Sequence, residues 1–131
     1  MRVVGIIIAV MACLVMPAPA QDHAKADPDH VKVVKENDQV RVLRYRYGPH
    51  EKSVQHSHPD NTVDVALTNG KVRLISPDGK FVENTVKAGD VNLNTASTHI
   101  VENLGDTAFE GLSIEPKTPA RVGPVQAAPA R

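Results

Sequence analysis

The regular spacing of turn-forming residues constrains the fold of this chain more than any other feature of its sequence. Gly48-Pro49, Pro59-Asp60-Asn61, Asn69-Gly70 and Pro77-Asp78-Gly79 recur roughly every ten residues. No apolar pattern with the period of a helix persists between them. The intervening segments predict short strands, at 31–35, 39–47, 53–58, 62–68, 71–75, 81–87, 90–94, 99–103 and 108–115. This pattern predicts a single all-β domain, built as a sandwich or a barrel.

Two details of the strand pattern give specific expectations. Asn69-Gly70 is the dipeptide most often found in tight hairpin turns, so strands 62–68 and 71–75 are predicted to pair through it. Val63, Val65 and Leu67 alternate along strand 62–68 and are predicted to share one face. If Val63 faces the interior, Asp64 faces away from it.

The two ends of the chain differ in composition from its centre. Arg2, an apolar run over 3–16 and Ala18-x-Ala20 are typical of a signal peptide cleaved near Ala20, so residues 1–20 predict export to the periplasm or out of the cell. A faint lipoprotein-like pattern leaves lipidation at Cys13 as an alternative. The run is shorter than the about 20 residues of a spanning helix, so no stable membrane insertion is expected. Residues 21–29 are predicted to be a flexible leader, 30–115 the barrel domain, and 116–131 a disordered Pro/Ala-rich tail.

The composition excludes several classes of function. The single cysteine lies in the predicted signal peptide, so the exported protein would have neither a disulfide nor a thiol nucleophile. The 15 Lys and Arg balance the 15 Asp and Glu, and the chain holds two Tyr, two Phe and no Trp. With no basic excess and little aromatic surface, nucleic acid is not expected as a partner. Phosphate-binding glycine loops and the Gly-x-Ser-x-Gly motif of hydrolases are absent from the sequence.

Three histidines are the candidate metal ligands of this chain. His56 and His58 alternate in a predicted strand, so their side chains are expected on the same face, with Cα atoms about 6.6 Å apart. His99 lies in a later strand and can complete the set from a second direction. Three ligands from one side leave positions open on the metal, which suits a catalytic or ligand-binding centre. The alternative is that His56 and His58 form a polar stripe on a solvent-facing strand.

The residues around these histidines resemble the two sequence motifs of the cupin superfamily. Gly48, His56-x-His58 and Gly70 resemble the first motif, and Gly89-Asp90-Val91 with His99-x-x-x-Asn103 resembles the second. The resemblance covers nearly the whole predicted core and is closest to small single-domain cupins. It implies a jelly-roll β-barrel that holds a metal ion inside through His56, His58 and His99.

The chain departs from the first motif at one functional position. Cupins usually carry a glutamate four or five residues after the second histidine, where this chain has Thr62 and Val63. Three neutral imidazoles would leave a divalent ion its full charge, which favours a small anionic ligand. Asp60 in the adjacent turn is a candidate fourth ligand. Imidazole accepts iron, zinc, nickel and copper, and manganese less readily.

The remaining polar residues are assigned simpler roles, and three classes of function stay open. We expect His23, His30 and His50 to lie on the surface. Asn103 is expected to have a structural role. Arg41, Arg44 and Arg46 are expected to lie on a strand face that is exposed to solvent. The first class is an exported metalloenzyme, such as the dioxygenases with three-histidine centres that the resemblance admits. The second is a barrel that binds a small ligand or a metal without catalysis. The third is a metal-free barrel that acts by self-association, for instance as a homodimer that exchanges strand 31–35.

Overall fold

The computed structural model describes residues 21–117, which form one short helix and nine strands. The predicted signal peptide, Cys13 and residues 118–131 of the predicted tail lie outside this range. Within it, no helix is long and apolar enough to cross a membrane. The elements are α1 (His23–Ala26), β1 (Val31–Glu36), β2 (Val40–Tyr47), β3 (His56–His58), β4 (Thr62–Ala66), β5 (Gly70–Ile75), β6 (Phe81–Val86), β7 (Val91–Asn94), β8 (Ser97–Asn103) and β9 (Phe109–Pro116).

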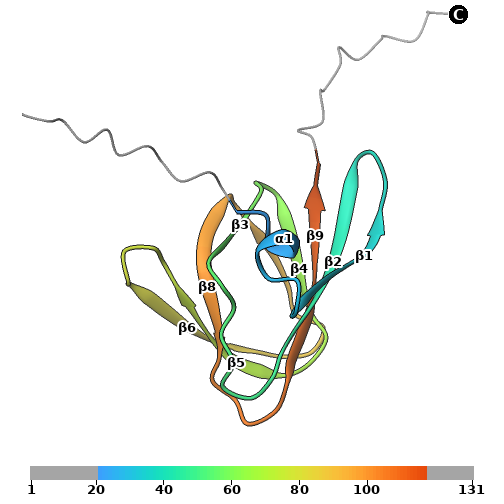
Figure 1. Ribbon diagram of the computed structural model, residues 1–131. Helices are drawn as coiled ribbons and strands as arrows, with labels where there is room; N and C mark the ends of the chain where they lie inside the picture. Colours follow the sequence, from blue (N-terminus) through green and yellow to red (C-terminus); the bar gives the residue numbers. More distant parts are fainter. Residues whose placement is uncertain (1–20, 118–131) are drawn as a thin grey trace, which may run out of the picture.

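The strands form two antiparallel sheets that face each other. One sheet has the order β1-β2-β9-β4-β7 and the other has the order β3-β8-β5-β6. In Figure 1 the two sheets diverge from the lower end of the molecule, and α1 lies between the β3/β8 side and the β9/β2 side. The prediction of a single all-β domain is confirmed.

The pairing of β2 with β9 builds the interior of the larger sheet. The residues of β9 alternate strictly between buried and half-buried, because successive side chains of a strand point to opposite faces. Of the buried apolar residues, Leu43 and Tyr47, both 0% exposed, and Phe109 lie on this pair, whereas Val31, Ala66 and Val72 lie on β1, β4 and β5. A Cβ atom at Gly111 would overlap the Tyr45 side chain, so this glycine lets Tyr45 lie across the strand.

The predicted Asn69-Gly70 hairpin is wrong. Strand β4 ends at Ala66 and pairs with β7 and β9, whereas β5 belongs to the other sheet. Gly70 is instead needed for space, because a Cβ atom there would lie 2.6 Å from the Phe109 ring. The turn predicted at Pro77-Asp78-Gly79 does connect the paired strands β5 and β6, and Gly79 has a φ of +84°.

Residues 21–29, predicted to be a flexible leader, instead contain α1 and pack against the barrel. The Ser57 amide donates a hydrogen bond to the Gln21 carbonyl over 2.7 Å. An Asp22 carboxylate oxygen accepts the Lys25 amide at 3.1 Å and caps α1. At the other end, β9 runs to Pro116, one residue into the predicted tail.

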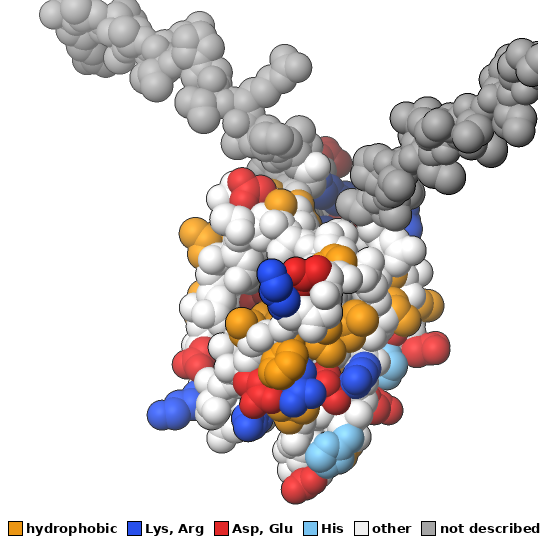
Figure 2. All heavy atoms as spheres, turned by 90° about the vertical axis from the view of Figure 1, so that its left-hand side faces the viewer, with side chains coloured by type: hydrophobic (Ala, Val, Ile, Leu, Met, Phe, Trp, Pro, Cys, Tyr) orange, Lys and Arg blue, Asp and Glu red, His pale blue; other side chains and the backbone are white. Residues whose placement is uncertain are grey.

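The two sheets differ at their free edges. The pairing of β1 with β2 is irregular between Val33 and Lys35. Figure 2 shows the β6 side of the molecule, where hydrophobic side chains gather among charged ones. Phe81 and Val82 of β6 are 57% and 58% exposed.

The homodimer predicted from the sequence, in which strand 31–35 is exchanged between two copies, stays a prediction.

Asn103 has the structural role expected from the sequence. It is 0% exposed, and its amide nitrogen donates to the carbonyls of Tyr47, Gly48 and Thr107 over 2.8–3.2 Å. Its amide oxygen accepts the Gly105 N–H at 3.0 Å. One buried side chain therefore fixes the end of β2, the end of β8 and the loop before β9.

We predict that Asn103→Ala destabilises the fold by about 2–4 kcal/mol, because it leaves several buried backbone groups without partners. Urea unfolding followed by circular dichroism measures this free energy. Asn69→Ala is the matched control, since the exposed Asn69 accepts a single hydrogen bond, from Ala88. Equal losses in the two variants would contradict the role given to Asn103.

Candidate metal centre

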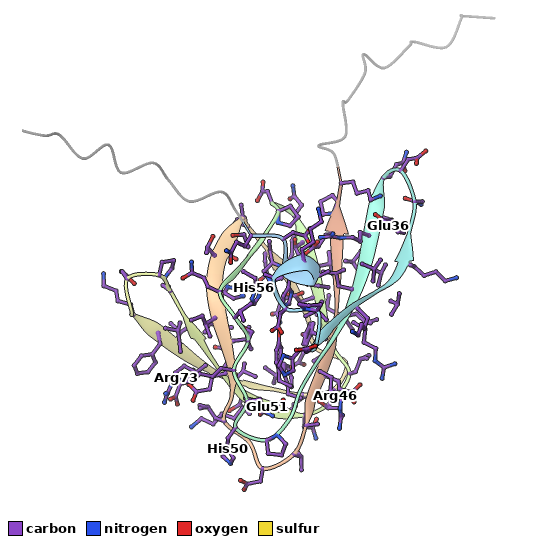
Figure 3. All side chains as sticks on the ribbon, viewed as in Figure 1. Glu36, Arg46, His50, Glu51, His56 and Arg73 are labelled. Atoms are coloured by element: carbon purple, nitrogen blue, oxygen red, sulfur yellow. The ribbon has the colours of Figure 1, made fainter. Side chains whose placement is uncertain are left out.

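Four histidine rings meet between the sheets, and three of them are the predicted ligands. His56 and His58 point inward from β3, and the pairing of β3 with β8 places His99 opposite His56. The ring centroids of His56 and His58 are 4.9 Å apart, those of His56 and His99 are 4.9 Å apart, and those of His58 and His99 are 5.2 Å apart. Figure 3 shows His56 directed into this space beside α1. The alternative of a solvent-facing polar stripe is wrong, since His56 is 0% and His58 8% exposed.

The fourth ring belongs to His23, which the sequence analysis placed on the surface. That prediction is wrong, because His23 is 3% exposed and stacks on His56 with centroids 3.5 Å apart. Its Nε2 atom is 2.8 Å from the Tyr47 hydroxyl. His50 is exposed as predicted and bonds Asp106, while His30 is half-buried beside Asp27.

Hydrogen bonds fix which nitrogen atoms face the centre. His56 Nδ1 donates to the Val54 carbonyl at 2.9 Å, and His58 Nδ1 donates to a Glu115 oxygen at 3.1 Å. Each bond leaves the Nε2 lone pair of that ring free to bind a metal. Within residues 21–117, the buried side-chain nitrogen and oxygen atoms without a hydrogen-bond partner are His56 Nε2 and His23 Nδ1. The unsatisfied polar atoms are thus concentrated where a metal ion would supply a partner.

Glu115 is a site residue that no motif in the sequence indicated. It is 2% exposed and joins His58 to Arg41, whose guanidinium lies 2.5 Å from Glu115 and 2.7 Å from Asp22. Burial alone would raise the pKa of Glu115, but hydrogen bonds from His58 and Arg41 outweigh it and lower the pKa. Arg41 is therefore not part of a solvated face, whereas Arg44 and Arg46 are exposed and pair with Glu110. The alternation of residues along β9 places Glu115 on the same inward face as Phe109 and Ser113, which is the sequence pattern that indicates its burial.

Asp64, and not Val63, lines the interior from β4. The buried residues of β4 are Thr62 and Ala66, and Asp64 shares their face. The expectation that Val63 faces the interior is wrong, because Val63 alternates along β4 with the buried Thr62 and the inward-facing Asp64. Burial raises the pKa of Asp64, although Ser113 and Asn94 donate hydrogen bonds to it. Asp60, the candidate fourth ligand, is exposed and accepts the Ala96 amide instead.

His23, His56 and His99 are neutral at physiological pH because they are buried. Desolvation lowers the pKa of His56 to about 4, of His99 to about 3 and of His23 to about 2. One ligand nitrogen of each of His23, His56 and His58 lies within 4.8 Å of the others. The nitrogen atoms of these three histidines are therefore close enough together to hold a metal ion; His99 lies outside this group, and its role as a ligand stays a prediction.

The histidines open onto a cavity of about 520 Å³. Its wall combines apolar side chains such as Val72 and Phe109 with the amides of Asn84, Asn92 and Asn94. Asp64 and Asp90 also line it, and the part of the chain that the structure describes contributes no Lys or Arg to the wall. A cavity of this size can take a small molecule.

Comparison with known proteins identifies the fold. No family model and no curated protein matches the sequence, but many solved structures match. A cupin domain from Bordetella pertussis Tohama I is 29% identical, with a TM-score of 0.62 over 67% of this chain and 92% of that chain. A Klebsiella pneumoniae protein with a double-stranded β-helix domain is 19% identical, with a TM-score of 0.55 over 77% and 81%. A cupin 2 barrel protein from Salinispora arenicola is 21% identical, with a TM-score of 0.51 over 76% and 87%. The predicted jelly-roll barrel is confirmed.

We predict that Glu115→Gln weakens zinc binding about 10- to 100-fold, because the carboxylate that orients His58 is lost. Competition against a chromophoric chelator measures the affinity. Glu110→Gln, which removes the partner of Arg44 and Arg46 on an exposed face, is the control and should bind zinc as the wild type does. Equal affinities in all three proteins would rule out a role for Glu115 in orienting the ligand.

We also predict that acid destabilises the metal-free protein steeply. In the unfolded chain, His23, His56 and His99 take up protons near their ordinary pKa of 6.5. In the folded protein they take up protons only near their lowered pKa values. The unfolded state then binds more protons, so the free energy of unfolding falls as pH falls, by up to about 1.4 kcal/mol per histidine and pH unit. Urea titrations at pH 7, 6 and 5 measure this slope. It should become shallower in His99→Ala, which removes one of the buried rings; a flat profile would contradict burial of the neutral rings.

Proposed function

We propose that this chain, which belongs to the cupin superfamily as a small single-domain protein, holds one divalent transition metal through His56, His58 and His99 and binds a small anionic molecule there. Export by the signal-like residues 1–20 is part of the proposal, so the protein would act in the periplasm or outside the cell.

The arrangement of three rings carries this proposal. No two of the rings of His56, His58 and His99 are parallel, and their centroids are separated by 4.9–5.2 Å. Rings that surround one ion are expected to be inclined and similarly spaced, because each binds through a lone pair in its own plane. The His58–Glu115 and His56–Val54 bonds supply the outer partners that metal-binding histidines usually have.

Because of the charge of the cavity wall, binding of an anionic ligand is expected to require the metal ion. Among the described wall residues the ionisable groups are histidines, tyrosines and the acids Asp64 and Asp90, so these side chains offer an anion no fixed cation. A bound divalent ion would supply the missing positive charge and act as a Lewis acid. Imidazole ligands suit iron, zinc, nickel or copper better than manganese. Apolar wall residues and the carboxamides can then position the rest of the ligand.

Metal analysis of protein purified without chelators tests the site. We expect one equivalent of a transition metal in the wild type and in His50→Ala, whose histidine is exposed, and loss of that metal in His56→Ala and His99→Ala. Folding of each variant is checked by circular dichroism. Absence of metal from the wild type after reconstitution would overturn the proposal and favour the metal-free barrel.

Calorimetry with a panel of small carboxylic acids tests the ligand. We expect binding to the metal-loaded protein and none after dialysis against a chelator, because the wall itself provides no cation. Oxygen consumption with a bound acid would identify an oxygenase, and binding without consumption a non-catalytic barrel. Equal binding with and without metal would contradict an anion held by the ion.

A further inference from the structure

The segment before β1 delivers a fourth imidazole to the proposed metal centre. His23 is the first residue of α1, is 3% exposed, and lies against both His56 and His58, with ring centroids 3.5 Å and 5.0 Å away. Its Nδ1 atom is buried without a hydrogen-bond partner, as is Nε2 of His56. A nitrogen of His23 also belongs to the group within 4.8 Å that includes His56 and His58.

The same segment is connected to the centre by a second route. Asp22, next to His23, pairs with Arg41, and Arg41 pairs with the Glu115 that bonds His58. The Gln21 carbonyl accepts the amide of Ser57, which lies between His56 and His58 in β3. The position of the segment is therefore set by the residues that also position the predicted ligands.

We propose that His23 is a further ligand of this ion, so that metal binding clamps residues 21–27 onto the barrel. The proposal rests on the metal centre proposed above and adds a ligand that lies outside the two sequence motifs. It accounts for the burial of an imidazole whose Nδ1 has no other partner, an arrangement that is costly unless a metal or a hydrogen bond satisfies the atom.

His23 cannot coordinate the ion and stack on His56 at the same time. Its ring is inclined by only 6° to that of His56, and one ion cannot lie in the planes of two stacked rings. His23 must therefore tilt away from His56 to bind. Its side chain has one hydrogen bond, to Tyr47, so the tilt breaks at most this bond and the stacking on His56. A variant that keeps an aromatic ring but lacks nitrogen separates the two roles.

Cobalt and zinc titrations of the purified protein test the proposal. We expect His23→Ala and His23→Phe to bind both ions at least about tenfold more weakly than the wild type, since loss of even an outer partner of a ligand has such an effect. The visible absorption of bound cobalt should also change, because the ligand set changes. His50→Ala is the control and should match the wild type. Wild-type affinity in His23→Phe would show that the ring only packs, and would overturn the proposal.

Limited proteolysis provides a readout that does not depend on affinity. Lys25 in α1 is exposed, so trypsin can report release of the segment by cleaving after it. Zinc at saturating concentration should slow this cleavage in the wild type and not in His23→Phe. Equal protection in both would contradict the clamp. If His56→Ala loses metal while both His23 variants keep wild-type affinity, the role of His23 as a ligand is contradicted and the proposed function stands. If the wild type binds no metal, both proposals fail.

Discussion

The pairing of β2 with β9 over eight residues is the interaction on which both the core and the histidine centre depend. Its ladder runs from Tyr47 opposite Phe109 at one end to Arg41 opposite Glu115 near the other. The first pair belongs to the apolar core, and the second fixes the orientation of His58. One strand register therefore sets the packing and the polarity of the interior together, and a slip by one residue would turn both outward.

The polar end of the barrel is stable only as a connected whole. Three buried imidazoles and the buried Glu115 share this region with the half-buried Asp64 and Arg41, and each buried polar group there is costly unless paired. Glu115 is satisfied by Arg41 and His58, and Asp64 by Ser113 and Asn94. Among the buried side-chain nitrogen and oxygen atoms of the described residues, only one nitrogen each of His23 and His56 is left without a partner. Two unsatisfied atoms within one pocket make metal binding a chemically natural completion of the network.

The parts of this structure that local patterns determine could be predicted from the sequence. Turn residues and alternation located the strands, and the two histidine motifs placed His56, His58 and His99 near one another. Prediction failed where distant pairing decided the outcome. The hairpin preference of Asn69-Gly70 yields to the pairing of β4 and β5 with different sheets, and the inward face of β4 holds Asp64 and not Val63. A helix as short as α1 leaves no periodic signal, and Glu115 meets Arg41 across 74 positions.

The irregularity in β1 has a consequence for contacts between molecules. A free strand edge can template another chain, and a bulge flanked by lysines is a common protection against such pairing. Strand β1 has such an irregularity between Val33 and Lys35, and Lys32 lies beside it. Although β1 is an edge strand, it is therefore a poor template for pairing with a strand of another molecule. The regular outer edge of the other sheet is β6, whose six residues include the exposed Phe81 and Val82. The second free edge of the larger sheet is β7, whose Val91 and Leu93 are 64% and 72% exposed, so edge-to-edge association between molecules can begin on either sheet.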